Sequence, residues 1–253
     1  MSKDFEKKFI DAVNSHLEGW AAKVNNDFSE VNFKSELKNL KGDPIYADFK
    51  FDTAEYVLIR LMGRMSISIG RRLGEIYDKI PRFAAAAKFD LLPEQIAPKF
   101  DGLELDISII LSDISEDNQN HVNEISKKYL KEKISGGLGI EIRYNFNPND
   151  SSRLRKDIKM GETLRKENYT PVYLVFSSIS PRQDAISRLT SSGWNFLIGE
   201  NAINFMNELL EIDLATILKK KEISQEIKKS VDGFMKNIYN SHAFQQVLLK
   251  YKA

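Results

Sequence analysis

The chain has 253 residues, enough for one large domain or for one core with a helical extension. Hydrophobic residues make up 42% and charged residues 29%, and the formal net charge is +1, so no global basic field indicates a nucleic-acid partner. Cysteine is absent, which excludes disulfides and zinc–thiolate sites, and the three scattered histidines (His16, His121, His242) argue against a histidine-rich metal site.

The N-terminal sequence MSKDFEKKFIDAV is charged and lacks the apolar run of a signal peptide. No later stretch approaches the ~18 apolar residues that a membrane span needs. We therefore expect a cytoplasmic protein with no membrane partner.

Helices are expected in the N-terminal part of the chain. Residues 3–24 carry apolar side chains at helical spacing, and a helical segment is expected over about 1–52, with a short strand in IYADFKF. A long helix is expected from residue 53 to 80, where Pro81 ends or kinks it.

From residue 102 onward, strand and helix patterns alternate. GLELDISIIL and GIEIRYNF alternate apolar and polar residues, TPVYLVF is a continuous apolar run, and GWNFLIG is a further strand pattern. Helical patterns lie between these segments, and a C-terminal helix is expected at about 222–251. This order predicts an α/β fold, a single domain over 1–253 whose mixed sheet core is flanked by helices on both faces.

Several common catalytic motifs are absent from the sequence. There is no GxxxxGK[ST], no GxSxG and no HExxH, and GGLG precedes a strand instead of joining a strand to a helix. Carboxylate chemistry remains.

Two carboxylates lie on the polar faces of consecutive predicted strands, Asp106 on the first and Glu141 on the second. If the strands are neighbours, these side chains converge, and Mg²⁺ is commonly bound by one or two carboxylates with phosphate oxygens and water. Such an ion activates water and stabilises charge on a phosphodiester. Arg143 projects from the same face as Glu141, where it can neutralise the transition state.

A simpler interpretation stands beside this one. A strand with Glu and Arg at alternate positions most often presents a solvated face to water. Arg71, Glu75 and Lys79 are spaced four residues apart and are also consistent with a surface ion-pair ladder worth ~0.3–0.5 kcal/mol per pair.

Asp106 followed by IEIR resembles the D…(D/E)xK signature of the PD-(D/E)XK nuclease superfamily. Five longer segments, in their order and spacing over about 55–218, resemble the ApaLI-like family of type II restriction endonucleases: SISIGRRLGEIYDKI, GLELD, IEIRYNFNPNDSSRLR, YTPVYLVF and SRLTSSGWNFLIGENAINF. The resemblance implies a restriction-endonuclease-like fold, Mg²⁺ dependence, and a homodimer that cuts both strands of a short palindrome in double-stranded DNA.

The resemblance also implies roles for single residues. Asp106 and Glu141 match the metal-binding carboxylates, and Glu75 in GRRLGE matches a helix glutamate that supports such sites. Arg143 stands where the pattern has lysine, and arginine does not readily give up a proton. Either Arg143 acts electrostatically, or Lys156 or Lys159 substitutes, or cleavage is poor.

The segment after the second strand is the main candidate for contact with DNA. Asparagine amides pair with adenine, and basic side chains near a helix N-terminus favour phosphate. An ordinary polar loop and a solvated helix face are the alternative. The candidate DNA-binding residues are Asn147, Asn149, Arg153, Arg155, Lys156, Arg71, Arg72, Arg182 and Gln183.

The sequence therefore predicts a cytoplasmic type II restriction endonuclease with Mg²⁺ as cofactor, which acts in defence against foreign DNA. Two alternatives remain. One is a sequence-specific DNA-binding protein that keeps the fold and cleaves little or not at all. The other is an interaction protein without a nucleic-acid partner, which the near-neutral charge favours.

Overall fold

The computed structural model describes residues 3–145, 151–179 and 183–251, and the chain divides into two compact units. We call Met1–Phe5 with Leu73–Leu214 the sheet unit, and Glu6–Arg72 with Ala215–Ala253 the helical unit. The long helix α4 (Ala54–Phe89) contributes to both and continues through Pro81. The prediction of a single domain stays a prediction, because this continuous helix belongs to both units.

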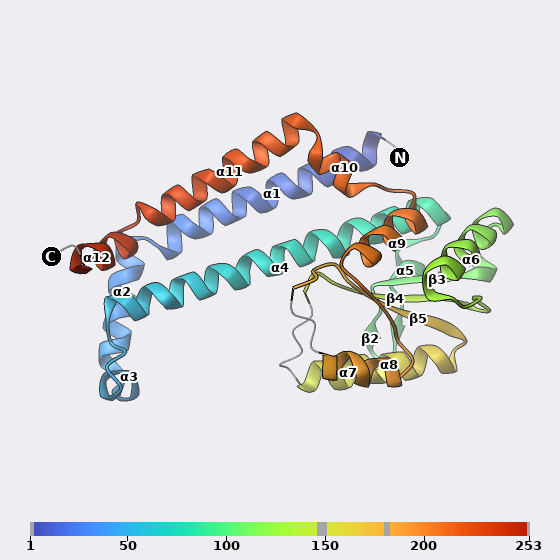
Figure 1. Cartoon of the computed structure of the whole chain (residues 1–253), viewed down its shortest axis with the longest axis horizontal. Coiled ribbons are helices and arrows are strands. Elements are labelled where there is room, and N and C mark those ends of the chain that lie inside the picture. The colour runs from blue at the N-terminus through green and yellow to red at the C-terminus, as the bar shows by residue number, and fades with distance from the viewer. Residues whose placement is uncertain (1–2, 146–150, 180–182, 252–253) are drawn as a thin grey trace. The chain divides into compact units, whose positions relative to one another are not determined.

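The helical unit contains the predicted N-terminal and C-terminal helices. Each described helix of this unit is labelled in Figure 1: α1 (Lys3–Asp27), α2 (Glu30–Gly42), α3 (Pro44–Asp48), the first half of α4, α10 (Leu214–Lys219), α11 (Lys221–Tyr239) and α12 (His242–Tyr251). Apolar side chains four residues apart on α1 are buried, as their spacing predicts: Phe5, Phe9, Val13 and Leu17.

Two sequence predictions for this unit were wrong. The segment IYADFKF does not form a strand, because Asp43 accepts hydrogen bonds from Ile45 N and Tyr46 N and so begins the short helix α3. The C-terminal helix is divided into α11 and α12, because Ser241 Oγ accepts a hydrogen bond from Phe244 N and begins a new helix.

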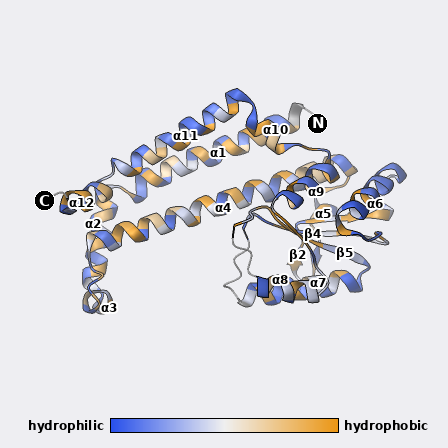
Figure 2. Ribbon diagram, viewed as in Figure 1, coloured by the Kyte–Doolittle hydropathy of each residue, from blue (hydrophilic) through white to orange (hydrophobic). Residues whose placement is uncertain are grey.

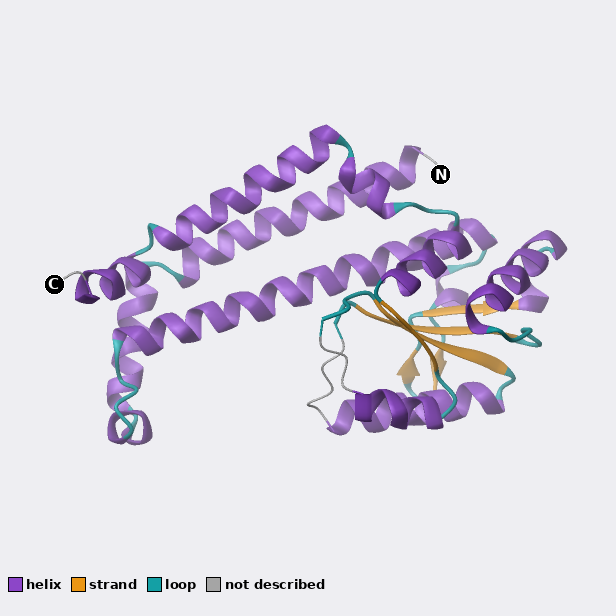
Figure 3. Ribbon diagram, in the orientation of Figure 1, coloured by secondary structure: helices purple, strands orange, loops and turns teal. Residues whose placement is uncertain are grey.

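The sheet unit is built on a mixed four-stranded sheet, drawn in orange in Figure 3. Its strands are β3 (Ile107–Ile110), β4 (Gly137–Arg143), β5 (Tyr169–Val175) and β6 (Asn195–Ile198), in the order β3–β4–β5–β6. β3 runs antiparallel to β4, whereas β4, β5 and β6 are parallel. The prediction of an α/β fold with a mixed sheet is confirmed.

The first predicted strand, GLELDISIIL, is interrupted. Leu103–Glu104 form β2, which pairs with β1 (Lys99–Phe100) in a separate small antiparallel sheet. The main-sheet strand β3 begins only at Ile107, whose partner on β4 is Ile140. Asp106 therefore lies in the break between the two strands, directly before β3.

Helices cover both faces of the four-stranded sheet. Figure 1 shows α7 (Ser151–Lys166) and α8 (Gln183–Ser191) on one side of the strands and α9 (Glu200–Leu210) on the other, where α6 (Glu116–Leu130) packs against it. The unit also contains the short helix α5 (Pro93–Ile96). Figure 2 shows the strands mainly in hydrophobic colours, whereas the helices carry both kinds of residue.

The α7–α8 face has a closely packed core: Leu105, Met160, Leu164, Tyr173, Val175, Ala185, Ile186, Leu189 and Trp194. Two glycines allow its elements to approach each other. A Cβ on Gly139 would lie 2.8 Å from Leu164, and a Cβ on Gly161 would lie 2.5 Å from Trp194 Nε1. Gly139 on the sheet therefore admits the Leu164 side chain of α7, and Gly161 on α7 admits the Trp194 side chain.

Within the described residues, none of the helices is both long enough and apolar enough to cross a membrane.

Candidate functional site: a buried carboxylate cluster

The charged face of β4 lies under a helix and is not open to water. Glu141 and Arg143 are two residues apart, so their side chains point to the same face, and Tyr173 is the neighbour of Glu141 on β5. This is the face that α7 covers, and only 6% of Glu141 is exposed. The interpretation of a solvated strand face was therefore wrong for Glu141.

Asp106 is buried beside this face, with 7% exposed, and both its carboxylate oxygens accept hydrogen bonds. Oδ2 accepts from the backbone N of Ile142 at 2.7 Å and from Arg143 Nη1 at 3.2 Å. Oδ1 accepts from Arg82 Nη2 at 2.6 Å. The backbone bond fixes Asp106 against β4, so the structure brings Asp106 and Glu141 together, as the sequence predicts for neighbouring strands.

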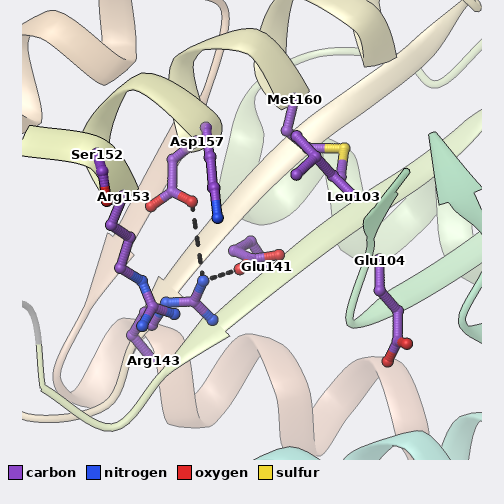
Figure 4. Close-up of a pocket in the computed structure, with 9 residues that line it drawn as sticks. Leu103, Glu104, Glu141, Arg143, Ser152, Arg153, Asp157 and Met160 are labelled. Carbon is purple, nitrogen blue, oxygen red and sulfur yellow. Dashed lines mark hydrogen bonds and ion pairs between the residues drawn. The ribbon is translucent and has the colours of Figure 1, made fainter. Parts of the chain in front are cut away.

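Arg143 lies at the centre of the site. Its Nη2 donates to Glu141 Oε1, and its Nη1 donates to the backbone oxygen of Ile142 at 2.6 Å, in addition to Asp106. Nη2 also lies 3.9 Å from Asp157 Oδ1. Figure 4 shows Arg143 between Glu141 on the strand and Asp157 on α7.

Asp157 and Tyr173 were not predicted as site residues. The Tyr173 hydroxyl, which is fully buried, donates to Asp157 Oδ2 at 2.9 Å, and the guanidinium of Arg143 lies 5.8 Å from the centre of the Tyr173 ring. A signal for Asp157 was present in the sequence. It lies three residues after Leu154 and four before Gly161, so it is a charge on the apolar stripe of α7, where burial is expected.

Arg82 on α4 was also missed, and it extends the site. Its guanidinium donates to Asp78 Oδ1 at 2.6 Å and to Glu104 Oε1 at 2.7 Å, as well as to Asp106. We call the seven connected side chains the carboxylate cluster: Asp78, Glu104, Asp106, Glu141, Asp157, Arg82 and Arg143. Five carboxylates share two guanidinium groups in it, so three negative charges are in excess when all are ionised.

Burial shifts the pKa values of two cluster carboxylates. Burial raises the pKa of Asp157, and Arg143 and the Tyr173 hydroxyl offset that rise only in part. Burial also raises the pKa of Asp78, and the nearby charge of Asp106 raises it further against the effect of Arg82. Burial therefore favours the uncharged form of both carboxyl groups.

A pocket of about 310 Å³ opens beside Arg143. β4 contributes Glu141 and Arg143 to its wall, and α7 contributes Arg153 and Lys156. The remaining lining residues are Leu103, Glu104, Ser152, Asp157 and Met160. The pocket thus has an acidic floor beside a basic rim, a combination that suits an anionic ligand bound through a cation.

Three other predicted residues, Glu75, Arg155 and Lys159, lie on the helices α4 and α7. Glu75 is half-buried on α4, one turn before Asp78, and the contacts from α4 to Asp106 come from Arg82. Arg155 is exposed on α7, and Lys159 Nζ lies 3.1 Å from Asp101 Oδ2.

The remaining DNA-binding candidates fall into three groups. Gln183 is exposed at the first turn of α8. Arg71 and Arg72 belong to the helical unit, where Arg72 Nη1 lies 3.5 Å from His16 Nδ1. Three candidates lie outside the described residues: Asn147, Asn149 and Arg182.

The oxygens around Arg143 suit a hard divalent cation in kind. Two carboxylates and one backbone carbonyl, those of Asp106, Glu141 and Ile142, surround the Arg143 guanidinium, and Mg²⁺ prefers oxygen ligands of this sort. In the described structure this guanidinium takes the place that a cation would need. In the part of the chain that the structure describes, no three Asp, Glu, His or Cys side chains are arranged to hold a metal ion. Mg²⁺ usually takes only one or two carboxylates and keeps several waters, so this smaller donor set fits it once the guanidinium has moved.

No family model matches the chain, and neither does any curated protein or solved structure.

Proposed function

We propose that the chain is a type II restriction endonuclease of the PD-(D/E)XK superfamily, with a restriction-endonuclease-like sheet unit, that cleaves double-stranded DNA by Mg²⁺-dependent hydrolysis. The observation that carries this proposal is that Asp106, Glu141 and the Ile142 carbonyl all bind one cationic group, the Arg143 guanidinium, beside a pocket with a basic rim. Hard oxygen ligands next to cations that hold phosphate are the parts that phosphodiester hydrolysis requires.

Asp106 and Glu141 are the side chains that would hold Mg²⁺. When bound, the ion supplies a water of lowered pKa and stabilises negative charge on the phosphodiester. The carboxylates of the cluster outnumber its arginines, which favours binding of a divalent cation beside Asp106 and Glu141.

Basic residues of α7 would hold the DNA backbone. Arg153 and Lys156 line the pocket and lie in the first turns of the helix, where the backbone N–H groups also favour phosphate. Phosphate contacts fix the position of a protein on the duplex and make its affinity fall with salt concentration. Arg143 adds a fixed positive charge and does not serve as a proton acceptor.

The proposal includes the biological setting. The enzyme would act as a homodimer in the cytoplasm and cut a short palindromic site, since two equivalent subunits place two active sites on a two-fold symmetric sequence. Its role would be defence against foreign DNA.

The test is cleavage of varied plasmid and phage DNA with Mg²⁺ and with EDTA. We expect discrete fragments that require Mg²⁺. Glu141→Gln should reduce the rate at least about a hundredfold, because loss of a metal ligand removes several kcal/mol of transition-state stabilisation. Glu162→Gln is the matched control, an exposed glutamate on α7 outside the pocket, and should cleave normally. A Glu141→Gln preparation that cuts like the parent would refute the proposal.

A second candidate is a DNA-binding protein that cleaves little or not at all. It is favoured by one observation, that Arg143 takes the position among the oxygens that a catalytic cation would need. It predicts specific retardation of DNA without cleavage in Mg²⁺ or Mn²⁺. A protein with no nucleic-acid partner would show no salt-sensitive DNA affinity in the same experiment.

A further inference from the structure

Arg143 makes its shortest contacts with the oxygens that would hold a cation. Nη1 donates to Ile142 O at 2.6 Å and to Asp106 Oδ2 at 3.2 Å, and Nη2 donates to Glu141 Oε1. A guanidinium and a divalent cation cannot occupy the same place among these oxygens, because they would overlap and two cations so close repel each other. We infer that Arg143 competes with the divalent cation for this position and must leave it when the cation enters. This inference rests on the proposed function.

In this position the Arg143 guanidinium does not use all of its hydrogen-bond donors. Its Nε–H is buried and has no hydrogen-bond partner among the described residues. Nη2 lies 3.9 Å from Asp157 Oδ1, which is too far for a hydrogen bond. A buried donor without a partner costs free energy, so Arg143 is held less firmly than its central position suggests.

The adjoining pocket gives the guanidinium a place to move to. Arg143 already forms part of its wall, and a volume of about 310 Å³ has room for a planar guanidinium and several waters. Asp157 and the ring of Tyr173 remain within reach as partners. In the pocket the fork of N–H groups would meet a phosphate oxygen held by Arg153 and Lys156, and arginine binds phosphate in this bidentate manner.

Competition of this kind lowers the apparent affinity for the cation. The cation binds only molecules in which Arg143 has moved out, so its dissociation constant is raised in inverse proportion to that fraction. Removing the guanidinium should therefore tighten cation binding while it destabilises the cation-free protein. A permanent structural arginine would predict only the second effect.

The experiment measures Mn²⁺ binding to the full chain by electron paramagnetic resonance of the free ion. We expect Arg143→Met to bind Mn²⁺ about tenfold or more tightly than the parent. Loss of a positive charge would by itself attract a cation, so Arg82→Met is the matched control. It removes the same charge from the cluster, but of the oxygens on Asp106, Glu141 and Ile142, Arg82 contacts Oδ1 of Asp106 and none that Arg143 contacts. We expect this control to show a smaller rise or a fall. An equal rise in both variants would overturn the competition.

A second measurement covers the case in which Arg143→Met does not fold. Arginine side-chain signals in ¹⁵N-edited NMR spectra of the parent report whether a guanidinium is locked in ion pairs. The Arg143 signals, assigned by their loss in Arg143→Lys, should shift when Mg²⁺ is added at a saturating concentration. Unchanged signals under these conditions would refute the displacement.

Failure of this inference is distinguishable from failure of the proposed function. Equal Mn²⁺ affinity in the parent and in Arg143→Met, with binding lost in Glu141→Gln, would remove the competition and leave the cation site intact. Absence of Mn²⁺ binding from the parent and from both arginine variants would remove the cation site itself.

Discussion

Charged side chains behave differently in the two units of this chain. In the sheet unit, Asp157 is buried and Asp78 is partly buried, and their pKa values are raised because burial outweighs the arginines nearby. In the helical unit, the hydrogen bond from Lys250 lowers the pKa of Glu55 to about 2. Acidic and basic side chains thus form an ion pair of balanced charge in the helical unit. In the sheet unit they form a cluster in which carboxylates outnumber arginines. Local neutralisation, and not composition, separates a structural ion pair from a candidate site.

The largest expected effect comes from removing the arginine at the centre of the cluster. Arg143→Met should lower the free energy of unfolding in EDTA by about 3–5 kcal/mol, because buried carboxylates lose their partner. Arg64→Met in the helical unit breaks the bond to Glu36 Oε1 at 2.5 Å, where 38% of the arginine side chain is exposed, and should cost about 0.2–1 kcal/mol. Urea unfolding at neutral pH measures both. Equal losses would show that the cluster is no more dependent on its arginine than a surface pair.

Glycine-to-alanine substitutions should have opposite signs in the two units. In Gly161→Ala the new Cβ would lie 2.5 Å from Trp194 Nε1 and should cost about 1–3 kcal/mol through overpacking. Gly63→Ala lies in the interior of α4, where a new Cβ meets nothing within 4 Å, and should gain about 0.5–1 kcal/mol through helix propensity. Thermal unfolding of the two variants and the parent is the measurement. A gain in Gly161→Ala would contradict the close approach of α7 to Trp194.

The smallest expected effects are in the pH dependence of stability. A carboxyl group whose folded pKa is raised binds more protons in the folded state, so it lowers stability as pH rises from its unfolded pKa to its folded one. Asp157→Asn should therefore remove a decline in stability that begins near pH 4. The pKa of Glu55 is lowered, so its effect on stability has the opposite sign. Glu55→Gln should remove a loss of stability that develops as pH falls from about 4.5 toward 2. Urea unfolding from pH 3 to pH 7 tests both signs. Parallel pH profiles for the two variants would contradict the contrast between the units.

The local sequence pattern was sufficient to predict much of the sheet unit. Alternation placed Glu141 and Arg143 on one face of a strand, and the apolar run TPVYLVF became β5, which is buried on both faces. The pattern does not state which face of β4 a helix covers, because that depends on packing between distant segments. Gly139 and Gly161 carried this information, but a glycine shows its packing role only once its neighbours are known.

The extent of the site could not be predicted for a related reason. Arg82 reaches Asp106 across 24 positions of sequence, and its periodicity on α4 resembles that of an ordinary surface residue. The break of the first predicted strand at Asp106 was also unforeseen, because GLELDISIIL alternates without interruption. A side-chain bond to the backbone of another strand overrides a regular pattern, and sequence periodicity does not reveal such a bond.

That bond affects how variants of Asp106 are to be understood. β3 ends its pairing with β4 at Ile107, and the next backbone donor on that side, Ile142 N, is satisfied by the Asp106 carboxylate. The Asp106 side chain thus adds one hydrogen bond to the pairing of β3 with β4. An alanine at position 106 would shorten this ladder as well as remove a carboxylate, so inactivity of that variant would combine two causes. Asparagine, which keeps an acceptor for Ile142 N, separates charge from architecture.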